Sequence, residues 1–343
     1  MRPLLTSLLI ATSCALADTS FPMEPTSPVG PNEVRVQRMD VGKSSATLII
    51  MMSLRETTVA FHDDKAPYMR TLSVTLTDND KEKIEQSIVI LGDTPVLSLV
   101  TTAPHNAQDY RITAYEPNGT LRGSALRKFR SGKMEETLFN ADGKPAPPDQ
   151  RSRILDMTPP EPVDLAKMPL QKQPIHGDVT KSDILQNPNE IRVEYFELGN
   201  GIGQAIYTPN LCEDRYFEND GKTLRARTVT ATLLDNDTER VFQSYFIRKN
   251  IVAFTQTTRL NKKTNELTDT YYTPKGNLLY SQRIIPGKIR KITDSAGNTI
   301  TLQQADQLLH TPNPDQIDID KVPLQDMTKP GKAPASTPTP QAE

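Results

Sequence analysis

The sequence predicts a mainly β protein made of two homologous antiparallel β-sheet domains of meanders and hairpins, joined by a Pro-rich linker, with few short helices. Two observations lead to this prediction. An internal repeat runs through most of the 343 residues, and short apolar segments separated by turn residues recur within each copy. The length itself fits two domains.

The repeat has a spacing of 157 residues. The segment PNEVRV at 31–36 recurs as PNEIRV at 188–193, and TLSVTLTDND at 71–80 recurs as TVTATLLDND at 228–237. At the same spacing YEPNGTL at 115–121 matches YTPKGNL at 272–278. Small deletions then bring the spacing to 154, at which VDLAKMPLQ at 163–171 matches IDIDKVPLQ at 317–325. Because chance does not readily produce so many ordered matches, we interpret the chain as a tandem duplication of one module.

Each copy is predicted to be β-structure. Leu72, Val74 and Leu76 alternate with polar residues, which is the period of a half-buried strand. Asn-Gly and Asp-Gly pairs between the apolar segments accept positive φ and therefore favour tight hairpins. The helical candidates are short and stand at the end of each copy, at 149–156 and 302–309.

These features divide the chain into a signal peptide, two β-domains and two extended segments. The boundaries are 1–17 for the signal peptide, 31–144 for the first domain, 145–187 for the Pro-rich linker or arm, 188–310 for the second domain, and 311–343 for a Pro-rich arm and disordered tail. The repeated Asp-x-x-Lys-x-Pro-Leu-Gln element in both extended segments is either an arm that packs back on its own domain or plain linker.

The N-terminus predicts export. One positive charge is followed by a short apolar run from Leu4 to Ala11, and Ala15-Leu16-Ala17 fits the small-x-small rule for signal peptidase. Cleavage after Ala17 places the mature protein in the periplasm. The alternative is lipid attachment at Cys14, which tethers the chain to a membrane. No later stretch has the length of a transmembrane helix.

Composition and motifs exclude several classes of function. There are 40 Lys and Arg against 42 Asp and Glu, a balance that argues against a nucleic-acid binder. The four histidines, His62, His105, His176 and His310, have no partner at metal-ligand spacing, so we expect no metal and no cofactor. The glycines at 199–203 lack the spacing of a dinucleotide loop and are interpreted as a hairpin. Cys212 is left unpaired and is interpreted as an inert thiol.

Candidate partner-binding residues come from two features. The copies diverge most between 43–70 and 200–227, where the second copy mixes aromatic and charged residues as binding hot spots do. Acidic triplets recur at 78–80 and 235–237; they are either contact loops for a basic partner or β-turns closed by their own side chains. The candidates are Tyr207, Glu213, Asp214, Arg215, Tyr216, Phe217, Glu218, Asp78, Asp80, Asp235 and Asp237.

The second half of each copy resembles the bacterial variant of MORN repeats found in antitoxin-like proteins. The resemblance rests on Tyr115, Gly119, Leu121, Gly132-Lys133, Phe139 and Asp142-Gly143, and in the second copy on Tyr272, Gly276, Leu278, Gly287 and Gly297. Thr293-Asp294 stands where the aromatic residue of the first copy is. The match covers 115–144 and 272–298 and implies hairpin units of a binding scaffold that masks another protein without catalysis of its own.

The leading hypothesis is therefore an exported, non-catalytic binding protein. We expect an immunity or inhibitor protein that occludes a secreted antibacterial effector, such as a lipase or wall hydrolase, in the periplasm. One alternative is an envelope structural or assembly factor, which lipid attachment at Cys14 would tether to the membrane. Another is an enzyme whose carboxylates come together only in space. The sequence leaves the partner and the oligomeric state open.

Overall fold

The computed structural model describes residues 30–41, 43–61, 68–105, 109–130, 133–155, 170–172, 187–199 and 201–326. The predicted signal peptide with Cys14, most of the predicted linker, His62, His176 and the end of the predicted tail lie outside the described residues.

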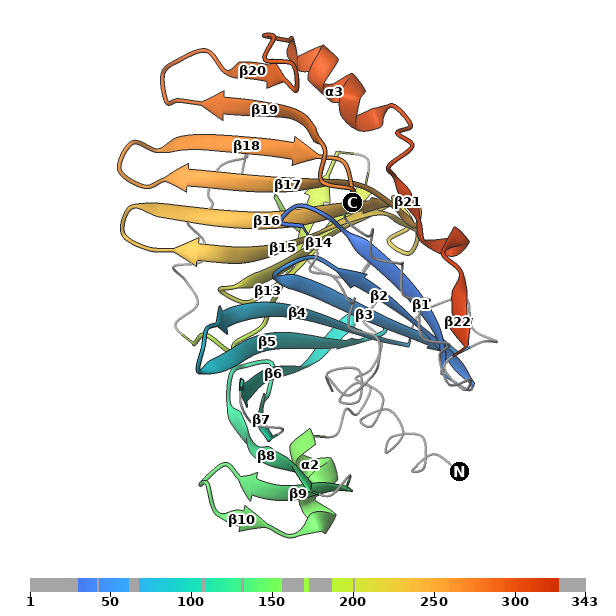
Figure 1. The fold of residues 1–343 in the computed structure, drawn as a ribbon, viewed down its shortest axis with the longest axis vertical. Coiled ribbons are helices and arrows are strands. Elements are labelled where there is room, and N and C mark those ends of the chain that lie inside the picture. The colour runs from blue at the N-terminus through green and yellow to red at the C-terminus, as the bar shows by residue number, and fades with distance from the viewer. Residues whose placement is uncertain are drawn as a thin grey trace, which may run out of the picture.

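The described chain is mainly β and forms two antiparallel sheets, as predicted (Figure 1). Within the described residues each sheet has 11 strands. The first sheet contains β1 (Arg35–Val41), β2 (Ser44–Ile50), β3 (Leu54–Phe61), β4 (Met69–Asp78), β5 (Glu82–Leu91), β6 (Thr94–Pro104), β7 (Tyr110–Tyr115), β8 (Leu121–Arg130), β9 (Lys133–Asn140), β10 (Pro145–Ala146) and β22 (Leu324–Asp326). The second contains β11 (Gln171–Lys172), β12 (Arg192–Leu198), β13 (Gly201–Tyr207), β14 (Leu211–Phe217), β15 (Leu224–Asp235), β16 (Glu239–Arg248), β17 (Ile251–Asn261), β18 (Glu266–Tyr272), β19 (Leu278–Ile284), β20 (Lys291–Asp294) and β21 (Ile317–Asp318).

The two sheets share strand order and register at the spacing of the sequence repeat. Neighbouring strands follow one another along the chain as hairpins from β1 to β10 and again from β12 to β20. Val59 pairs with Met69 in the first sheet, and Tyr216 pairs with Ala226 at the equivalent place in the second. The bulge between Thr75 and Thr77 in β4 recurs between Thr232 and Leu234 in β15.

The bulges explain one difference from the predicted alternation. Leu72 and Val74 are fully buried, but Leu76 is 40% exposed because the register shift after Thr75 turns it to solvent. Leu233 in the equivalent position is 37% exposed. The predicted helices are present as a short 3-10 turn η1 (Pro148–Gln150) with α2 (Arg151–Leu155), and as α3 (Leu302–His310).

The repeated arms cross to the opposite sheet. The strand β22, at the end of the second copy, pairs in parallel with β1 of the first sheet, and β11, at the end of the first copy, pairs in parallel with β12 of the second. The guanidinium of Arg38 in β1 also donates to the carbonyl oxygen of Asp320 at 2.9 Å. The arm of the second copy first pairs with its own sheet through β21 and then crosses to the first sheet through β22, so the expected packing on its own domain holds for its first part. The exchanged strands β22 and β11 cover the β1 and β12 edges, which would otherwise be open.

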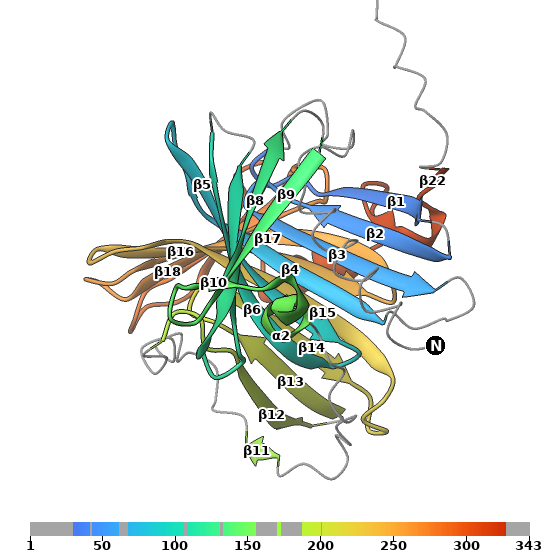
Figure 2. The ribbon, with the colours of Figure 1, turned by 90° about the horizontal axis from the view of Figure 1, so that it is seen from below.

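A shared apolar core joins the two sheets where they cross (Figure 2). Its members come in equivalent pairs from both sheets: Val34 and Ile191, Ile49 and Ile206, Leu54 and Leu211, Leu72 and Val229, Val74 and Ala231, Ile90 and Ile247. A second cluster on the first sheet includes Ile154 and Leu155 of α2. The two halves thus share one apolar core, because part of one face of each sheet is buried against the other sheet.

Backbone bonds tie the halves together reciprocally. The amide of Val34 donates to the carbonyl of Pro274 at 2.7 Å, and the amide of Ile191 donates to the carbonyl of Pro117 at 2.7 Å. Each bond joins the residue just before the first strand of one copy to a hairpin turn of the other copy. Both turns contain a glycine at positive φ, Gly119 at 80° and Gly276 at 84°, where a side chain would be strained. The pattern is that of a dimer with two-fold symmetry fused into one chain.

Candidate functional site

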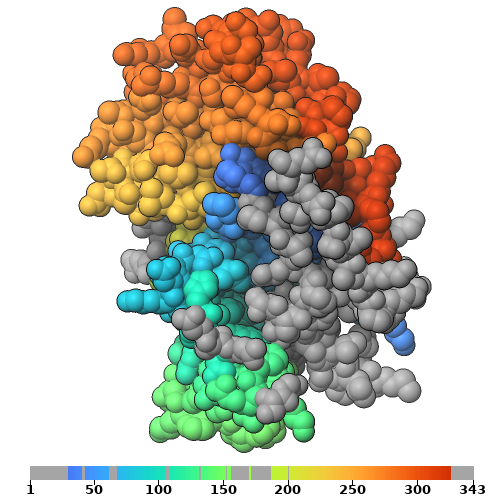
Figure 3. All heavy atoms as spheres, viewed as in Figure 1, coloured from blue at the N-terminus to red at the C-terminus, as the bar shows by residue number. Residues whose placement is uncertain are grey.

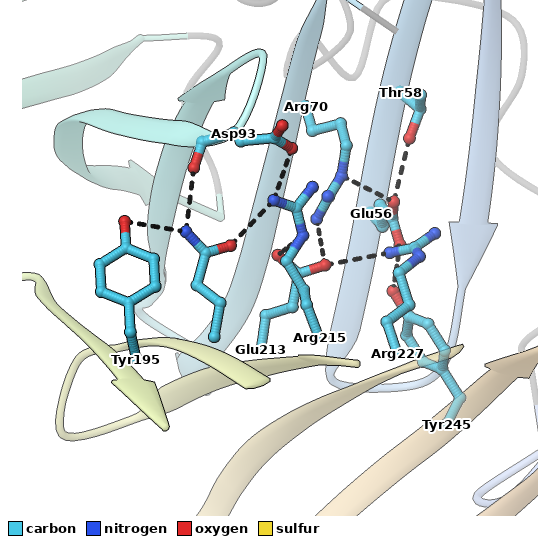
Figure 4. A network of polar contacts seen from close by, with 10 residues as sticks. Glu56, Thr58, Arg70, Asp93, Tyr195, Glu213, Arg215, Arg227 and Tyr245 are labelled. Atoms are coloured by element: carbon cyan, nitrogen blue, oxygen red, sulfur yellow. Dashed lines mark hydrogen bonds and ion pairs between the residues drawn. The ribbon is translucent and has the colours of Figure 1, made fainter. Parts of the chain in front are cut away.

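A buried cluster of charged residues lies between the two sheets (Figure 4). Glu56 on β3 and Glu213 on β14 are 0% exposed, and Arg70 on β4 is 4% exposed. Arg227 on β15 is 11% exposed at its side chain. Because an unpaired buried charge is costly, the arrangement of partners decides what such a cluster can do.

The ion pairs cross between the sheets in both directions. Arg70 of the first sheet donates to Glu213 of the second, and Arg227 of the second donates to Glu56 of the first at 2.7 Å. Arg70 also lies 3.4 Å from Glu56, and Arg227 lies 3.5 Å from Glu213. Glu56 and Glu213 are equivalent in the repeat, as are Arg70 and Arg227, so the four charges form a closed two-fold square.

On one side the square is extended by a residue of the second sheet that has no charged equivalent in the first sheet. Arg215 donates to Asp93 at 2.7 Å and to the Gln204 side-chain oxygen at 3.1 Å, and its Nε lies 3.5 Å from Glu213. On the other side the Tyr245 hydroxyl donates to Glu56. The second sheet has Arg215 and Tyr245 where the first has Thr58 and Ile88. Three guanidinium groups therefore face three carboxylates, and the cluster is neutral.

The arginines keep both central carboxylates ionised. Burial pushes the pKa of Glu56 upward, but Arg227 and Arg70 outweigh burial and lower that pKa to about 2. Burial acts in the same way on Glu213, and Arg70, Arg215 and Arg227 together lower its pKa. A carboxylate held ionised in this way is a poor proton donor or acceptor near neutral pH. The cluster accordingly stabilises the contact between the sheets above the unfolded pKa of 4.5, and this contribution is lost as the pH falls toward 2.

The structure brings some of the sequence-predicted binding residues together and separates others. Glu213 belongs to the square and Arg215 extends it; both are buried and engage residues of the first sheet. Tyr207 donates to Glu194 at 2.7 Å. Tyr216 and Phe217 line a pocket at the end of β14, and Glu218 lies exposed just beyond them.

The acidic triplets are exposed β-turns that connect β4 to β5 and β15 to β16. Asn79 accepts backbone bonds from Lys81 and Glu82, and Asn236 accepts them from Thr238 and Glu239. The flanking acids Asp78, Asp80, Asp235 and Asp237 are exposed. Asp78 bonds His105 at 2.9 Å, and Asp235 pairs with Arg240 and Lys262. The turn alternative for these loops is confirmed by the backbone bonds.

Cys212 and Asp214 lie side by side on the other face of β14. Burial raises the pKa of the Cys212 thiol well above its usual value, and the nearby Asp214 and Glu213 raise it further. A raised pKa lowers the thiolate fraction at neutral pH, which is what an inert thiol requires. Burial also raises the pKa of Asp214 to about 6.

Replacing Asp214 is expected to stabilise the protein at neutral pH. The folded-state pKa of about 6 exceeds the unfolded value of 3.8, so ionised Asp214 opposes folding above pH 6 and has no such effect at low pH. Asp214→Asn should raise the free energy of unfolding at pH 7.5 by up to about 2–3 kcal/mol, as measured by urea denaturation. The gain should vanish near pH 3.5. A variant no more stable than wild type at pH 7.5 contradicts this account of Asp214.

The described residues contain no group of three or more His, Cys, Asp or Glu side chains placed to hold a metal ion. His105 is exposed beside Asp78, and His310 is exposed at the end of α3. Among the helices of the described chain, none has the length and apolar composition needed to cross a bilayer.

A row of aromatic side chains crosses the second sheet on the face that points away from the first. The rings of Phe246 and Phe254 stack at 4.9 Å, Phe254 meets Tyr271 at 5.8 Å, and Tyr271 stacks on Tyr280 at 4.4 Å. The first sheet has Val89, Leu97, Ala114 and Gly123 in the equivalent positions. Phe246, Phe254 and Tyr271 are half-buried, so part of each ring faces solvent.

No protein-family model matches the sequence, and no curated protein matches it. The resemblance to MORN variants stays a prediction.

Proposed function

We propose that this chain is an exported, non-catalytic binding protein, and specifically an immunity or inhibitor protein that occludes a secreted antibacterial effector. The observation that carries the proposal is the aromatic row of Phe246, Phe254 and Tyr271, which is half-buried on the outer face of the second sheet. Aromatic rings of this kind supply most of the binding energy in many protein interfaces.

Two further features support a binding role. The charged groups of the buried square are paired with one another inside the molecule. Glu56 and Glu213 are fully buried, and their arginine partners lower the pKa of both carboxyls. The two sheets share one core, so the outer face of the second sheet is carried on a rigid support. A rigid face binds without paying a large ordering cost, which favours tight occlusion of a target.

The proposal is tested with the product of the neighbouring gene. We expect the purified protein to capture that product at fixed stoichiometry and to block its lipase or wall-hydrolase activity, and we expect deletion of this chain to make cells sensitive to their kin. Phe254→Ser should weaken capture, whereas Leu76→Ser, an exposed leucine on the first sheet, should leave it unchanged. If neighbouring genes encode no effector and the deletion strain is no more sensitive, the immunity function is contradicted and an envelope structural factor is favoured.

A further inference from the structure

A pocket of about 410 Å³ opens where β12 to β16 end together, beside the last residue of α3. Its lining includes Tyr216, Arg225, Ala226, Phe246, Arg248 and His310. The volume lies within the range of small-molecule sites, roughly 300–1,000 Å³. The lining combines aromatic rings, two arginines and a histidine with small and aliphatic residues, and the described lining includes no carboxylate.

The packing of α3 explains how His310 reaches this place. A capping box at Thr301 and Gln304 starts the helix, and Ala305 packs with Tyr280 and Ile292 of the second sheet. The helix is thereby fixed along the sheet, and its last residue lies at the pocket. The orange and red residues of β17 to β20 and α3 form one continuous mass in the space-filling view (Figure 3).

The first sheet provides an internal comparison for five positions of the pocket. Val59, Tyr68, Met69, Val89 and Leu91 stand there in place of Tyr216, Arg225, Ala226, Phe246 and Arg248. All five residues of the first sheet belong to or pack against its apolar cluster. Since the fold is the same, the pocket arises from the change of side chains: Met69 is replaced by the small Ala226, and two apolar neighbours are replaced by arginines.

The two arginines are available to a ligand. Arg225 and Arg248 flank Ala226, which pairs with Arg248 across the β15–β16 ladder. Both side chains are exposed, and no hydrogen bond or ion pair joins either of them to another described residue. Within the described part of the chain these two guanidinium groups have no partner, and beside aromatic rings they attract an anion. Guanidinium is well shaped for carboxylate or phosphate oxygens.

We propose that this pocket binds a small amphiphilic anion, with an acidic head on Arg225 and Arg248 and an apolar or aromatic body against Tyr216 and Phe246. The pocket shares Phe246 with the aromatic row of the proposed effector surface, but Arg225 and Arg248 stand outside that row. Variants of these two arginines therefore test anion binding, and Phe254→Ser tests effector capture.

Calorimetric titration with 4-phenylbutyrate tests the assignment, with its uncharged amide and with acetate as matched probes. We expect 4-phenylbutyrate to bind at least about tenfold more tightly than either, because only it offers both the charge and the apolar body. Arg225→Gln and Arg248→Gln should each remove most of the preference for the acid over the amide. Arg259→Gln, which removes the same charge from the far end of β17, should keep it.

A filled pocket provides the second arm of the test. Ala226→Met introduces the residue of the first sheet at this position and should abolish binding of both acid and amide, while circular dichroism shows an unchanged fold. Equal affinities for acid and amide, wild-type binding by the Arg225→Gln and Arg248→Gln variants, or no binding of 4-phenylbutyrate to the wild type would each overturn the proposal. Each of these results leaves the effector-capture test unaffected.

Discussion

Glu56→Ala is expected to lower the free energy of unfolding by about 3–5 kcal/mol, because it leaves Arg227 and Arg70 buried without one of their two carboxylates. The Tyr245 hydroxyl loses its acceptor in the same change. Glu213→Ala, at the equivalent position, should lower the free energy of unfolding by a similar amount. Urea denaturation at pH 7 measures both.

A glutamate in a surface ion pair is the control for the loss of charge. Glu266 pairs with Arg283 at the surface of the second sheet, where the arginine side chain is 57% exposed. Glu266→Ala should therefore change the unfolding free energy by no more than about 1 kcal/mol. Similar losses for Glu56→Ala and Glu266→Ala would contradict the role assigned to the buried square.

Leu54→Ala and Leu211→Ala are expected to cost about 2–5 kcal/mol each. The two leucines are equivalent in the repeat, each is 1% exposed, and both lie in the apolar core between the sheets. Each truncation removes apolar contacts and leaves a cavity that close-packed neighbours fill only in part. Thermal and urea unfolding should each show a single transition that moves to lower stability.

Another equivalent pair of leucines provides the control. Leu76 and Leu233 are 40% and 37% exposed, although the sequence alternation places them with the buried residues of their strands. Leu76→Ala and Leu233→Ala should change stability by no more than about 0.5 kcal/mol. Losses as large as those of the core pair would show that these surface leucines, and not the core between the sheets, carry the stability.

The fold class could be predicted because it depends on local patterns. Alternating apolar residues and turn residues such as Asn118-Gly119 define strands and hairpins within a short window, and the repeat shows that both halves use them. The crossing of the sheets could not be predicted in the same way. It depends on the paired faces of β3, β4, β14 and β15, and a strand pattern does not tell which sheet covers a given face. The exchange of arms was missed for the same reason.

The sequence does contain a pattern that indicates the buried square. The stretch from 43 to 70 and its counterpart from 200 to 227 diverge strongly, yet Glu56 and Arg70 recur as Glu213 and Arg227. Charges kept in both copies within otherwise changed strands point to a mutual partner. The pocket of Arg225 and Arg248 had no such signal, because its residues come together only through the folding of β12 to β16 and the placement of α3.

Hydrogen exchange of the Leu211→Ala variant tests most directly whether the two sheets are one cooperative body. Leu211 lies in the second sheet, and its core partners Leu72 and Val74 lie on β4 of the first. We expect the slowest amides of β4 and of β15 to lose protection by the same factor, because both become exposed only when the common core opens. Loss of protection confined to the second sheet, with β4 unchanged, would contradict a fused two-fold body and show two independent domains.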